Sequence, residues 1–558
     1  MKAHKGGALK VRGGNAVDGK EMAASLQAKA AQAPEEARAS GPRKGEEHPP
    51  KMAAHLGPAA PPKRSALKYE TQKPSARGPK AKGPVVDTPA PKKSWQATLQ
   101  SKGGFPADAQ IAVSSTHVIV SNRQTMRYYD KNGNPVSDNI GSKAFFTTGL
   151  NLKDAAGNAI NVFNDLRLIF DSYRKRFWVT AYAGYSDAAN VTASKRRYYI
   201  PMAVSKTQNP LDGWFFYYTD GAAQQGVANS SIWKAGDAPD YPIMGIDKQA
   251  ITITHAVNRA DNSAGYWRVF FFPADSFASG QFQSGWQFWD LKNPDGGATG
   301  IITPAVHHGT PSGGRAYWLG RQGSDKIVVW AITDPFTAAR KVKAVAVDIP
   351  SGFSTPVNGQ QKGSTKLIKF TNLGNNVMKA AYRNGFLHMV TNDAHDWGNI
   401  GKVRTSIHYV RLPVGQWPTV PSPPDAGGVD RIFGGGNPNE NITGLKHYGW
   451  AAVEANKNGD AIIGYARTGE KVYPEVRGSA YFADASDISP SRQVKAGDQS
   501  ADNPNATGAN AVIWWGDTSG ASVDPSDDTG IWIAQEYAST TASSNGNYDI
   551  WVAKFFGS

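Results

Sequence analysis

Polar residues suited to chemistry recur where short apolar segments of this 558-residue chain begin. Five of them form our predicted ligand site: Asp165, Arg167, Asp240, Arg477 and Asp517. Paired carboxyl groups do the acid, base or nucleophile work of a glycosidase, and arginine grips carboxylate or phosphate groups through parallel hydrogen bonds. These residue types indicate a site that binds, or cleaves, a polar ligand.

Each of these residues also has a purely structural alternative, because an aspartate before a strand caps turn amides and an arginine pairs with it. For glycosidase catalysis, the candidate carboxylates by position are Asp165, Asp240, Asp517 and Glu536. A sialidase is disfavoured, since the repeated Ser-x-Asp-x-Gly-x-x-Trp turns of sialidases are missing from the sequence. A serine hydrolase is disfavoured too, since the sequence contains no Gly-x-Ser-x-Gly elbow.

A second group of carboxylates lies near the end of the chain, where Asp524, Asp527 and Asp528 fall within five residues. Because Ca²⁺ takes about six to eight oxygen ligands, this segment predicts a calcium site, the one cofactor that the sequence suggests. A charged hairpin turn is the alternative, because the spacing differs from that of known calcium loops. The sequence has no cysteine, which excludes thiolate zinc sites, iron–sulfur clusters and a cysteine nucleophile.

Charge divides the chain into two parts. Residues 1–95 hold 19 Lys and Arg against 8 Asp and Glu, a net charge of +11, whereas residues 96–558 carry only +4. The first part is rich in Pro, Ala, Gly and Lys, so it buries too little apolar surface to offset its ordering entropy. We expect a disordered basic arm over 1–95, either a solvated spacer or a segment that contacts an anionic surface.

Residues 96–558 have the character of an all-β domain. Apolar residues come in β-branched and aromatic runs of about five to eight, punctuated by Gly, Asn, Asp and Pro. Two of the connectors, 130–134 and 456–460, contain the Asn-Gly pair that is typical of hairpins. Aromatic runs such as 214–218 and 267–272 fit packing between sheets better than a sugar-stacking platform.

Seven segments of this domain open alike, with a strand, a polar turn and a second strand rich in aromatics. They begin near Ile111, Asp165, Asp240, Thr303, Asn376, His447 and Ile513, at a mean spacing of 67 residues. A unit of this size holds one four-stranded blade with its loops, so we predict a seven-bladed β-propeller over 96–558. Six or eight blades are the alternatives, because the units after Thr303 and Asn376 are weakly marked.

The last segment, 549–556, reads as a strong strand. We expect it to pair with residues around Trp95–Leu99 and so to close the ring. The domain's nearly balanced charge disfavours nucleic acid as a partner, and no stretch approaches the roughly 18 apolar residues of a membrane span.

Three motifs resemble those of a broad group of bacterial extracellular β-propeller proteins of unassigned activity. They are the closing run 515–537, which contains Trp515-Gly-Asp, together with the segments 203–214 and 240–247. The resemblance implies a secreted or cell-surface location, although the sequence shows no apolar run of the length that a secretory signal needs.

We therefore expect a binding module for glycan or protein ligands on the axial face of the propeller. The alternatives are a glycosidase-like hydrolase that uses carboxylates on the same face, and a structural scaffold. Convergent carboxyl groups with raised pKa values would favour the enzyme, whereas a flat aromatic face would favour the binding module.

Overall fold

Short strands make up most of the protein, which we describe from a computed structural model. The structure describes residues 6–9, 11–18, 20, 22, 83–97, 106–184, 196–221, 237–260, 265–281, 283, 285–289, 291–310, 312–397, 402–435, 446–503, 506, 508, 511–541 and 547–557. Two short α-helices lie among them, α2 (Ser142–Gly149) and α3 (Ala274–Ala278). The prediction of an all-β chain is confirmed.

Within the described residues, the strands form seven antiparallel meanders of four strands each. The first is β4 (Gln110–Val113), β5 (His117–Ser121), β6 (Thr125–Asp130) and β7 (Ile140–Gly141). The second is β8 (Val162–Asp171), β9 (Arg176–Gly184), β10 (Tyr199–Ser205) and β11 (Gly213–Asp220). The third is β12 (Ala238–Ile246), β13 (Ala250–Asn258), β14 (Tyr266–Pro273) and β15 (Gly285–Phe288). The fourth is β16 (Thr303–Pro304), β18 (Arg315–Gln322), β19 (Lys326–Thr333) and β20 (Lys341–Asp348).

Three further meanders complete the set. The fifth is β23 (Val377–Arg383), β24 (Phe386–His395), β25 (Arg404–Pro413) and β26 (Val429–Phe433). The sixth is β27 (Lys446–Ala455), β28 (Ala461–Gly469), β29 (Val472–Tyr481) and β30 (Arg492–Lys495). The seventh joins β32 (Gly520–Val523), β33 (Ile531–Ala538) and β34 (Tyr548–Phe555) to the early strand β3 (Lys93–Ala97). Short strands between the meanders are β17 (Val306–His307), β21 (Gly359–Gln361), β22 (Ser364–Ile368) and β31 (Val512–Ile513).

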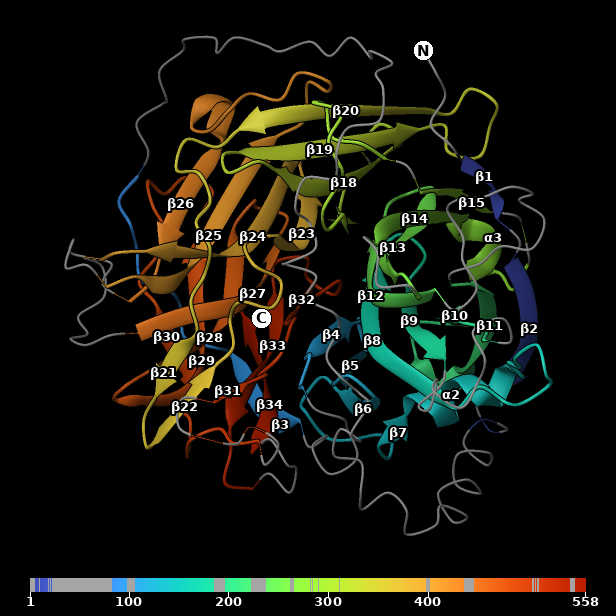
Figure 1. Ribbon diagram of the computed structural model, residues 1–558, viewed down its shortest axis with the longest axis horizontal. Coiled ribbons are helices and arrows are strands. Elements are labelled where there is room, and N and C mark those ends of the chain that lie inside the picture. Colours follow the sequence, from blue (N-terminus) through green and yellow to red (C-terminus); the bar gives the residue numbers. More distant parts are fainter. Residues whose placement is uncertain are drawn as a thin grey trace.

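The first strands of the seven meanders lie beside one another in a closed circle. Strand β4 contacts β8, and the contacts continue through β12, β16, β23, β27 and β32 back to β4. The remaining strands of each meander extend outward from this circle, which gives the molecule a propeller-like form (Figure 1). Side chains on the first strands therefore meet at one axis although they are far apart in the sequence.

The circle is closed by strands from opposite ends of the domain. Lys93–Ala97 in β3 pairs antiparallel with Ile550–Lys554 in β34, which confirms the pairing predicted from the sequence. The indole ring of Trp95 packs against Trp532 and Tyr129, with ring centroids 5.2 and 6.2 Å away. Backbone hydrogen bonds and buried aromatic surface thus hold the seventh meander to the first.

Part of the predicted arm is ordered along the outside of the ring. Strands β1 (Gly6–Leu9) and β2 (Val11–Asp18) pair with the outer strands β15 and β11. Residues 83–92 also pack on the sixth meander, where the Thr88 hydroxyl donates to the carbonyl of Pro490 at 2.7 Å. A segment pairs with an outer strand through backbone hydrogen bonds, which any sequence can form. The low apolar content of the arm therefore does not predict whether it pairs. Residues 23–82 of the arm lie outside the described residues.

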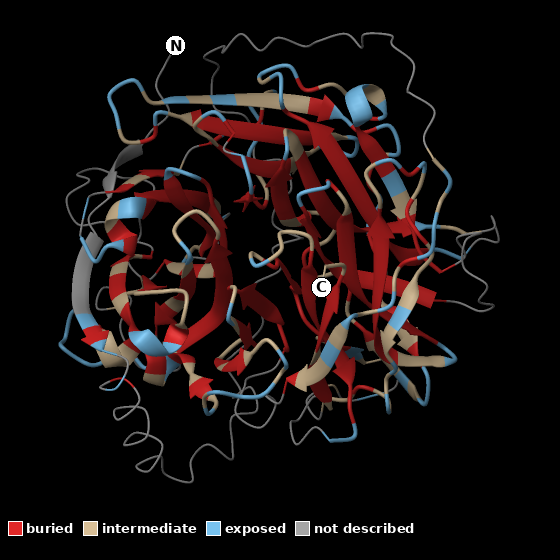
Figure 2. Ribbon diagram, turned by 180° about the vertical axis from the view of Figure 1, so that it is seen from behind, coloured by how far each residue is buried: buried red, intermediate tan, exposed pale blue. Residues whose placement is uncertain are grey.

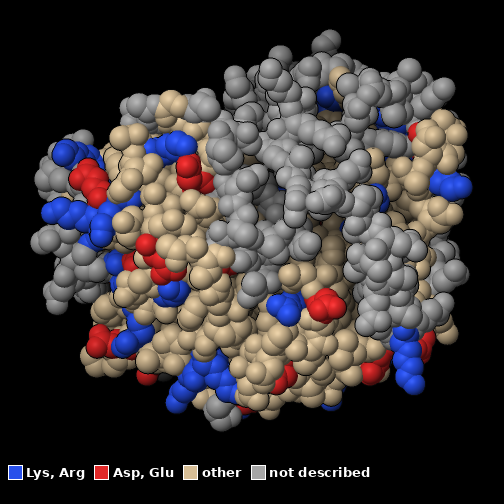
Figure 3. Space-filling model, turned by 90° about the horizontal axis from the view of Figure 1, so that it is seen from below, with Lys and Arg blue, Asp and Glu red and all other residues tan. Residues whose placement is uncertain are grey.

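The core lies between neighbouring meanders rather than at one centre. Buried residues follow the strands closest to the axis, and exposed residues appear on outer strands such as β20 (Figure 2). Trp214 and Phe216, which the sequence places in an aromatic run, are fully buried in this core. On the face seen in Figure 3, basic and acidic side chains are interspersed across the described surface. Among the described residues, no helix is long and apolar enough to cross a membrane.

Replacing Trp95 with alanine tests the closure. Because the partly buried indole joins the first and last meanders, we expect a loss of roughly 2 kcal/mol in the free energy of unfolding, below the range for a fully buried Trp. Urea unfolding measures it, with the exposed Val86→Ala as the control. Equal stability of the two variants would contradict closure by this contact.

Candidate functional site

One end of the central circle is built to turn side chains toward the axis. Asp108 lies just before β4, and Asp165, Tyr241 and Trp450 lie within β8, β12 and β27. All four have left-handed backbones, with φ of 47°, 57°, 51° and 53°. A register shift accompanies three of them, in the pairs β8–β9, β12–β13 and β27–β28. Such a backbone is uncommon for residues other than glycine, and bulges re-aim side chains at functional sites.

Four of the five predicted ligand residues converge at this end. Burial has the largest effect on Asp108, Asp240 and Asp517 and raises the pKa of each. The charge of Asp165 raises the pKa of Asp240 and of Asp517 further. The charge of Arg167 lowers the pKa of Asp108. We call Asp108, Asp165, Asp240, Asp517 and Glu536, together with Arg123, Arg167 and Tyr241, the axial cluster.

Asp517 lies just before β32, and its carboxyl group accepts two side-chain hydrogen bonds. Its Oδ1 accepts hydrogen bonds from Asn372 Nδ2 at 2.7 Å and Trp514 Nε1 at 2.9 Å. Its backbone N–H donates to Asp108 Oδ1 at 2.7 Å. Burial, reinforced by the charge of Asp108, raises the pKa of Asp517 to about 8. Burial therefore favours the protonated form of Asp517, and because both donors reach Oδ1, Oδ2 is the oxygen left to carry the proton.

Asp240 and Asp165 form the other side of the cluster. Asp240 Oδ2 accepts a hydrogen bond from Asn258 Nδ2 at 3.2 Å, while burial and then the charge of Asp165 raise the pKa of Asp240 to about 6. Asp165 Oδ1 accepts from Arg123 Nε at 2.9 Å in an ion pair whose arginine side chain is 21% exposed. The cluster thus combines two carboxyls whose pKa values are raised to different extents with an ion pair that reaches solvent.

Glu536 lies on β33 behind Asp517. It is fully buried, and neither carboxyl oxygen has a hydrogen-bond partner among the described residues. Burial raises the pKa of Glu536 well above its ordinary value, and the nearby Asp108 and Asp517 act in the same direction. A Cβ on Gly516 would lie 2.9 Å from Glu536 Oε1, so the chain passes close to this carboxyl, and a larger residue would displace the end of the Glu536 side chain.

Three cluster residues were not found by the sequence analysis: Asp108, Arg123 and Tyr241. Asp108 precedes its strand as Asp517 does, so the same signal is present in the sequence. Arg123 follows a second strand, between β5 and β6, where the sequence offers no such signal. Tyr241 lies within the segment 240–247, one of the three motifs that carry the resemblance. Its hydroxyl donates to the carbonyl of Asp517 at 3.4 Å.

Arg477 is not brought to the cluster. It lies on β29, the third strand of its meander, where its Nε donates to Ser491 Oγ at 2.9 Å and its Nη1 is 3.6 Å from Glu475 Oε1. Arg467 on the neighbouring strand also pairs with Glu475. The structure therefore places Arg477 in an ion-pair network between strands, and we leave it out of the candidate site.

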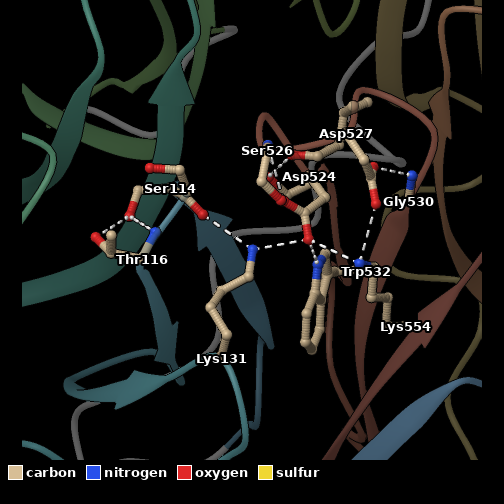
Figure 4. A network of polar contacts seen from close by, with 12 residues as sticks. Ser114, Thr116, Lys131, Asp524, Ser526, Asp527, Gly530, Trp532 and Lys554 are labelled. Atoms are coloured by element: carbon tan, nitrogen blue, oxygen red, sulfur yellow. Dashed lines mark hydrogen bonds and ion pairs between the residues drawn. The ribbon is translucent and has the colours of Figure 1, made fainter. Parts of the chain in front are cut away.

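The three carboxylates of the predicted calcium site lie beyond the far end of β32, away from the axial cluster. Asp524 Oδ2 is 2.7 Å from Lys131 Nζ and 3.1 Å from Lys554 Nζ, and it accepts from Trp532 Nε1 at 2.9 Å (Figure 4). Lys554 also lies 3.2 Å from Asp527 Oδ2, and Arg383 pairs with Asp528.

This arrangement differs from a calcium cage, because each carboxylate is directed at a basic side chain. Among the described residues, no group of three His, Cys, Asp or Glu is arranged to hold a metal ion. The contacts fasten the seventh meander to the first and the fifth, as the hairpin-turn alternative implies. Calcium binding here stays a prediction from the sequence.

No protein-family model matches the chain, and no curated protein matches it. Solved structures align with it at low identity. Trypanosoma rangeli sialidase in complex with the inhibitor DANA aligns with a TM-score of 0.32 and 9% identity, over 84% of this chain and 60% of that one. The α-L-arabinofuranosidase Arb93A from Fusarium graminearum aligns with a TM-score of 0.28 and 12% identity, over 72% and 91%. A GH62 hydrolase in complex with xylotriose aligns with a TM-score of 0.25 and 10% identity, over 57% and 91%.

Replacing Asp524 with asparagine tests the ion-pair assignment. The change leaves Lys131 and Lys554 without their shared carboxylate, and we expect a loss of about 3–5 kcal/mol in unfolding free energy at pH 7. The Lys131 ammonium lowers the pKa of Asp524, although burial opposes it, so the stabilisation is present above the unfolded pKa and is lost as the pH falls below it. Denaturant unfolding at several pH values measures both effects.

The exposed ion pair of Asp348 and Lys326 provides the matched control, and Asp348→Asn is expected to change stability by less than about 1 kcal/mol. A small loss in Asp524→Asn would contradict the ion-pair assignment. A rise in stability with Ca²⁺ that Asp524→Asn abolishes would support the calcium prediction instead.

Proposed function

We propose that this protein hydrolyses glycosidic bonds at the axial cluster, by general acid–base catalysis with its carboxyl groups. The observation that carries the proposal is the convergence of Asp517 and Asp240 on Asp165, where burial and then the charges of neighbouring carboxylates raise the pKa of Asp517 to about 8 and that of Asp240 to about 6. Environments that push the pKa values of nearby titratable groups apart assign one as the acid and the other as the base. Convergent carboxyls with raised pKa values are also the feature that favours an enzyme over a binding module.

The roles follow from these protonation states. Asp517 gives its Oδ2 proton to the glycosidic oxygen as the bond from that oxygen to the anomeric carbon breaks. A water oxygen forms the new bond to the anomeric carbon, and the Asp240 carboxylate takes the proton that the water loses. Arg123 holds the Asp165 carboxylate in place through a net-neutral ion pair, and the oxygens of that carboxylate face the sugar ring as the ring becomes positively charged.

We further propose that the ring is a seven-bladed propeller with each four-stranded meander as one blade, and that the protein works on extracellular glycans. The cycle of contacts among seven first strands supports the blade number. The resemblance noted in the sequence supports the location.

A glycan-binding module without catalysis is the second candidate. Trp514 is partly exposed beside Asp517, and the Lys369 ammonium lies 5.1 Å from the centre of its ring. With Asn372, these side chains offer an apolar face and polar groups of the kind that hold a sugar. This candidate uses the same end of the ring and differs in the fate of the ligand.

Incubation of the full chain with a panel of polysaccharides, followed by mass spectrometry, distinguishes the candidates. We expect cleavage products that disappear in Asp517→Asn and in Asp240→Asn and persist in the surface control Asp348→Asn, with all three variants folded by circular dichroism. Retention of a polysaccharide without cleavage would contradict hydrolysis and support the binding module. Neither cleavage nor retention would leave the scaffold as the remaining interpretation.

The pH dependence of hydrolysis follows from the two groups. Activity is expected to fall as the pH drops through about 6, where Asp240 gains a proton, and as it rises through about 8, where Asp517 loses one. Initial rates at subsaturating substrate, in buffers of constant ionic strength from pH 4 to 10, measure this bell-shaped profile. A profile that stays flat from about pH 7 to 10 would exclude Asp517 as the acid.

A further inference from the structure

A small cavity lies on the axis of the ring next to the axial cluster. Its volume is about 20 Å³, which is room for a monatomic ion or one to two waters. Its walls come from β4, β8, β12, β16 and β23 and from the residues just before β32. The charged and polar residues that line it, besides Tyr241, are Gln110, Arg167, Thr303, Lys379, Thr518 and Ser519. Two of these are basic, and none of the described lining residues is acidic.

Arg167 brings an unpartnered donor to this cavity. The residue is only 4% exposed, and its guanidinium lies 5.0 Å from the centre of the Tyr241 ring. Its Nε donates to the carbonyl of Pro242 at 2.8 Å and its Nη1 to the carbonyl of Leu166 at 3.3 Å. Its Nη2 has no hydrogen-bond partner among the described residues. A guanidinium stays charged in proteins, so a buried Nη2 calls for an acceptor.

Lys379 supplies the second cation. It lies on β23 and lines this cavity together with a smaller one of about 10 Å³ further along the axis. The smaller cavity is also lined by Glu454, which lies 3.2 Å from His308 Nε2. Burial and the charge of Arg167 lower the pKa of Lys379, whereas Glu454 raises it. Glu454 therefore lines only the smaller cavity, while the larger one is lined by two cations that repel each other.

We propose that the larger axial cavity binds a small monovalent anion, such as chloride, between Arg167 and Lys379. The anion accepts hydrogen bonds from Arg167 Nη2 and from the Lys379 ammonium. The Thr518 hydroxyl accepts from Gln110 Nε2 at 2.8 Å, which leaves its own hydrogen to donate to the anion. The ion thereby neutralises the repulsion between β8 and β23, which lie across the axis from each other in the circle of first strands. This site shares Arg167 with the axial cluster, but the proposal does not depend on the proposed hydrolysis.

Bromide is the probe, because it substitutes for chloride and scatters X-rays anomalously. The full chain is prepared in sodium gluconate without halide, and sodium bromide then replaces gluconate at constant ionic strength. We expect the melting temperature to rise saturably, on the order of 2 °C or more, since a ligand that binds only the folded state stabilises it. In crystals grown with bromide, we expect an anomalous peak between Arg167 and Lys379.

Lys379→Met keeps the apolar stem and removes the charge, so we expect its melting temperature to be independent of bromide. Lys369→Met is the matched control: it removes a partly buried lysine that does not line the cavity, and the bromide response should persist. An equal response in both variants, or no anomalous peak in the cavity of the unaltered protein, would overturn the proposal and leave water as the occupant. The crystallographic result decides even if Lys379→Met fails to fold.

Discussion

The pairing of β3 with β34 is the contact on which the rest of the structure depends. A sheet with free edges exposes unpaired amides and carbonyls, and a ring of sheets removes that exposure between neighbours only if its last member meets its first. Here the last meander takes its fourth strand from the beginning of the domain, so residues 93–97 and 550–554 are held together by backbone hydrogen bonds and by Trp95. The circle of first strands then has a fixed diameter and a common axis.

The chemistry at the axis is a consequence of that closure. Polar residues from several first strands are forced into one buried volume, where desolvation disfavours their charged forms. Asp517 and Glu536 respond with raised pKa values, while Asp165 is supported by Arg123. The strained backbones at Asp108 and Asp165 are the local cost of aiming carboxyls inward. At the opposite end of the ring, the Asp524 carboxylate is neutralised directly by ion pairs with Lys131 and Lys554.

Much of this organisation follows from patterns that are local in the sequence. The spacing of the units indicates where first strands begin, and in the structure Asp165, Arg167, Asp240 and Asp517 converge at one end of the ring. Arg477 could not be placed in this way. Its partner Glu475 lies two residues away on the same strand, so their pairing says nothing about the axis. The distance of Arg477 from the axis depends on the order of the strands in its sheet. Arg123 and the two cations of the axial cavity depend on which meanders face each other, and only the closed ring determines that.

If a carboxyl of the axial cluster carries a proton at neutral pH, infrared spectroscopy detects it without a substrate. The C=O stretch of a protonated carboxyl is distinct from the bands of a carboxylate, so a pH titration of the folded protein follows Asp517 through its difference from Asp517→Asn. We predict a protonated-carboxyl band at pH 7 that titrates near pH 8 and is missing from the spectrum of Asp517→Asn. Identical spectra of the two proteins at pH 7 would contradict this prediction.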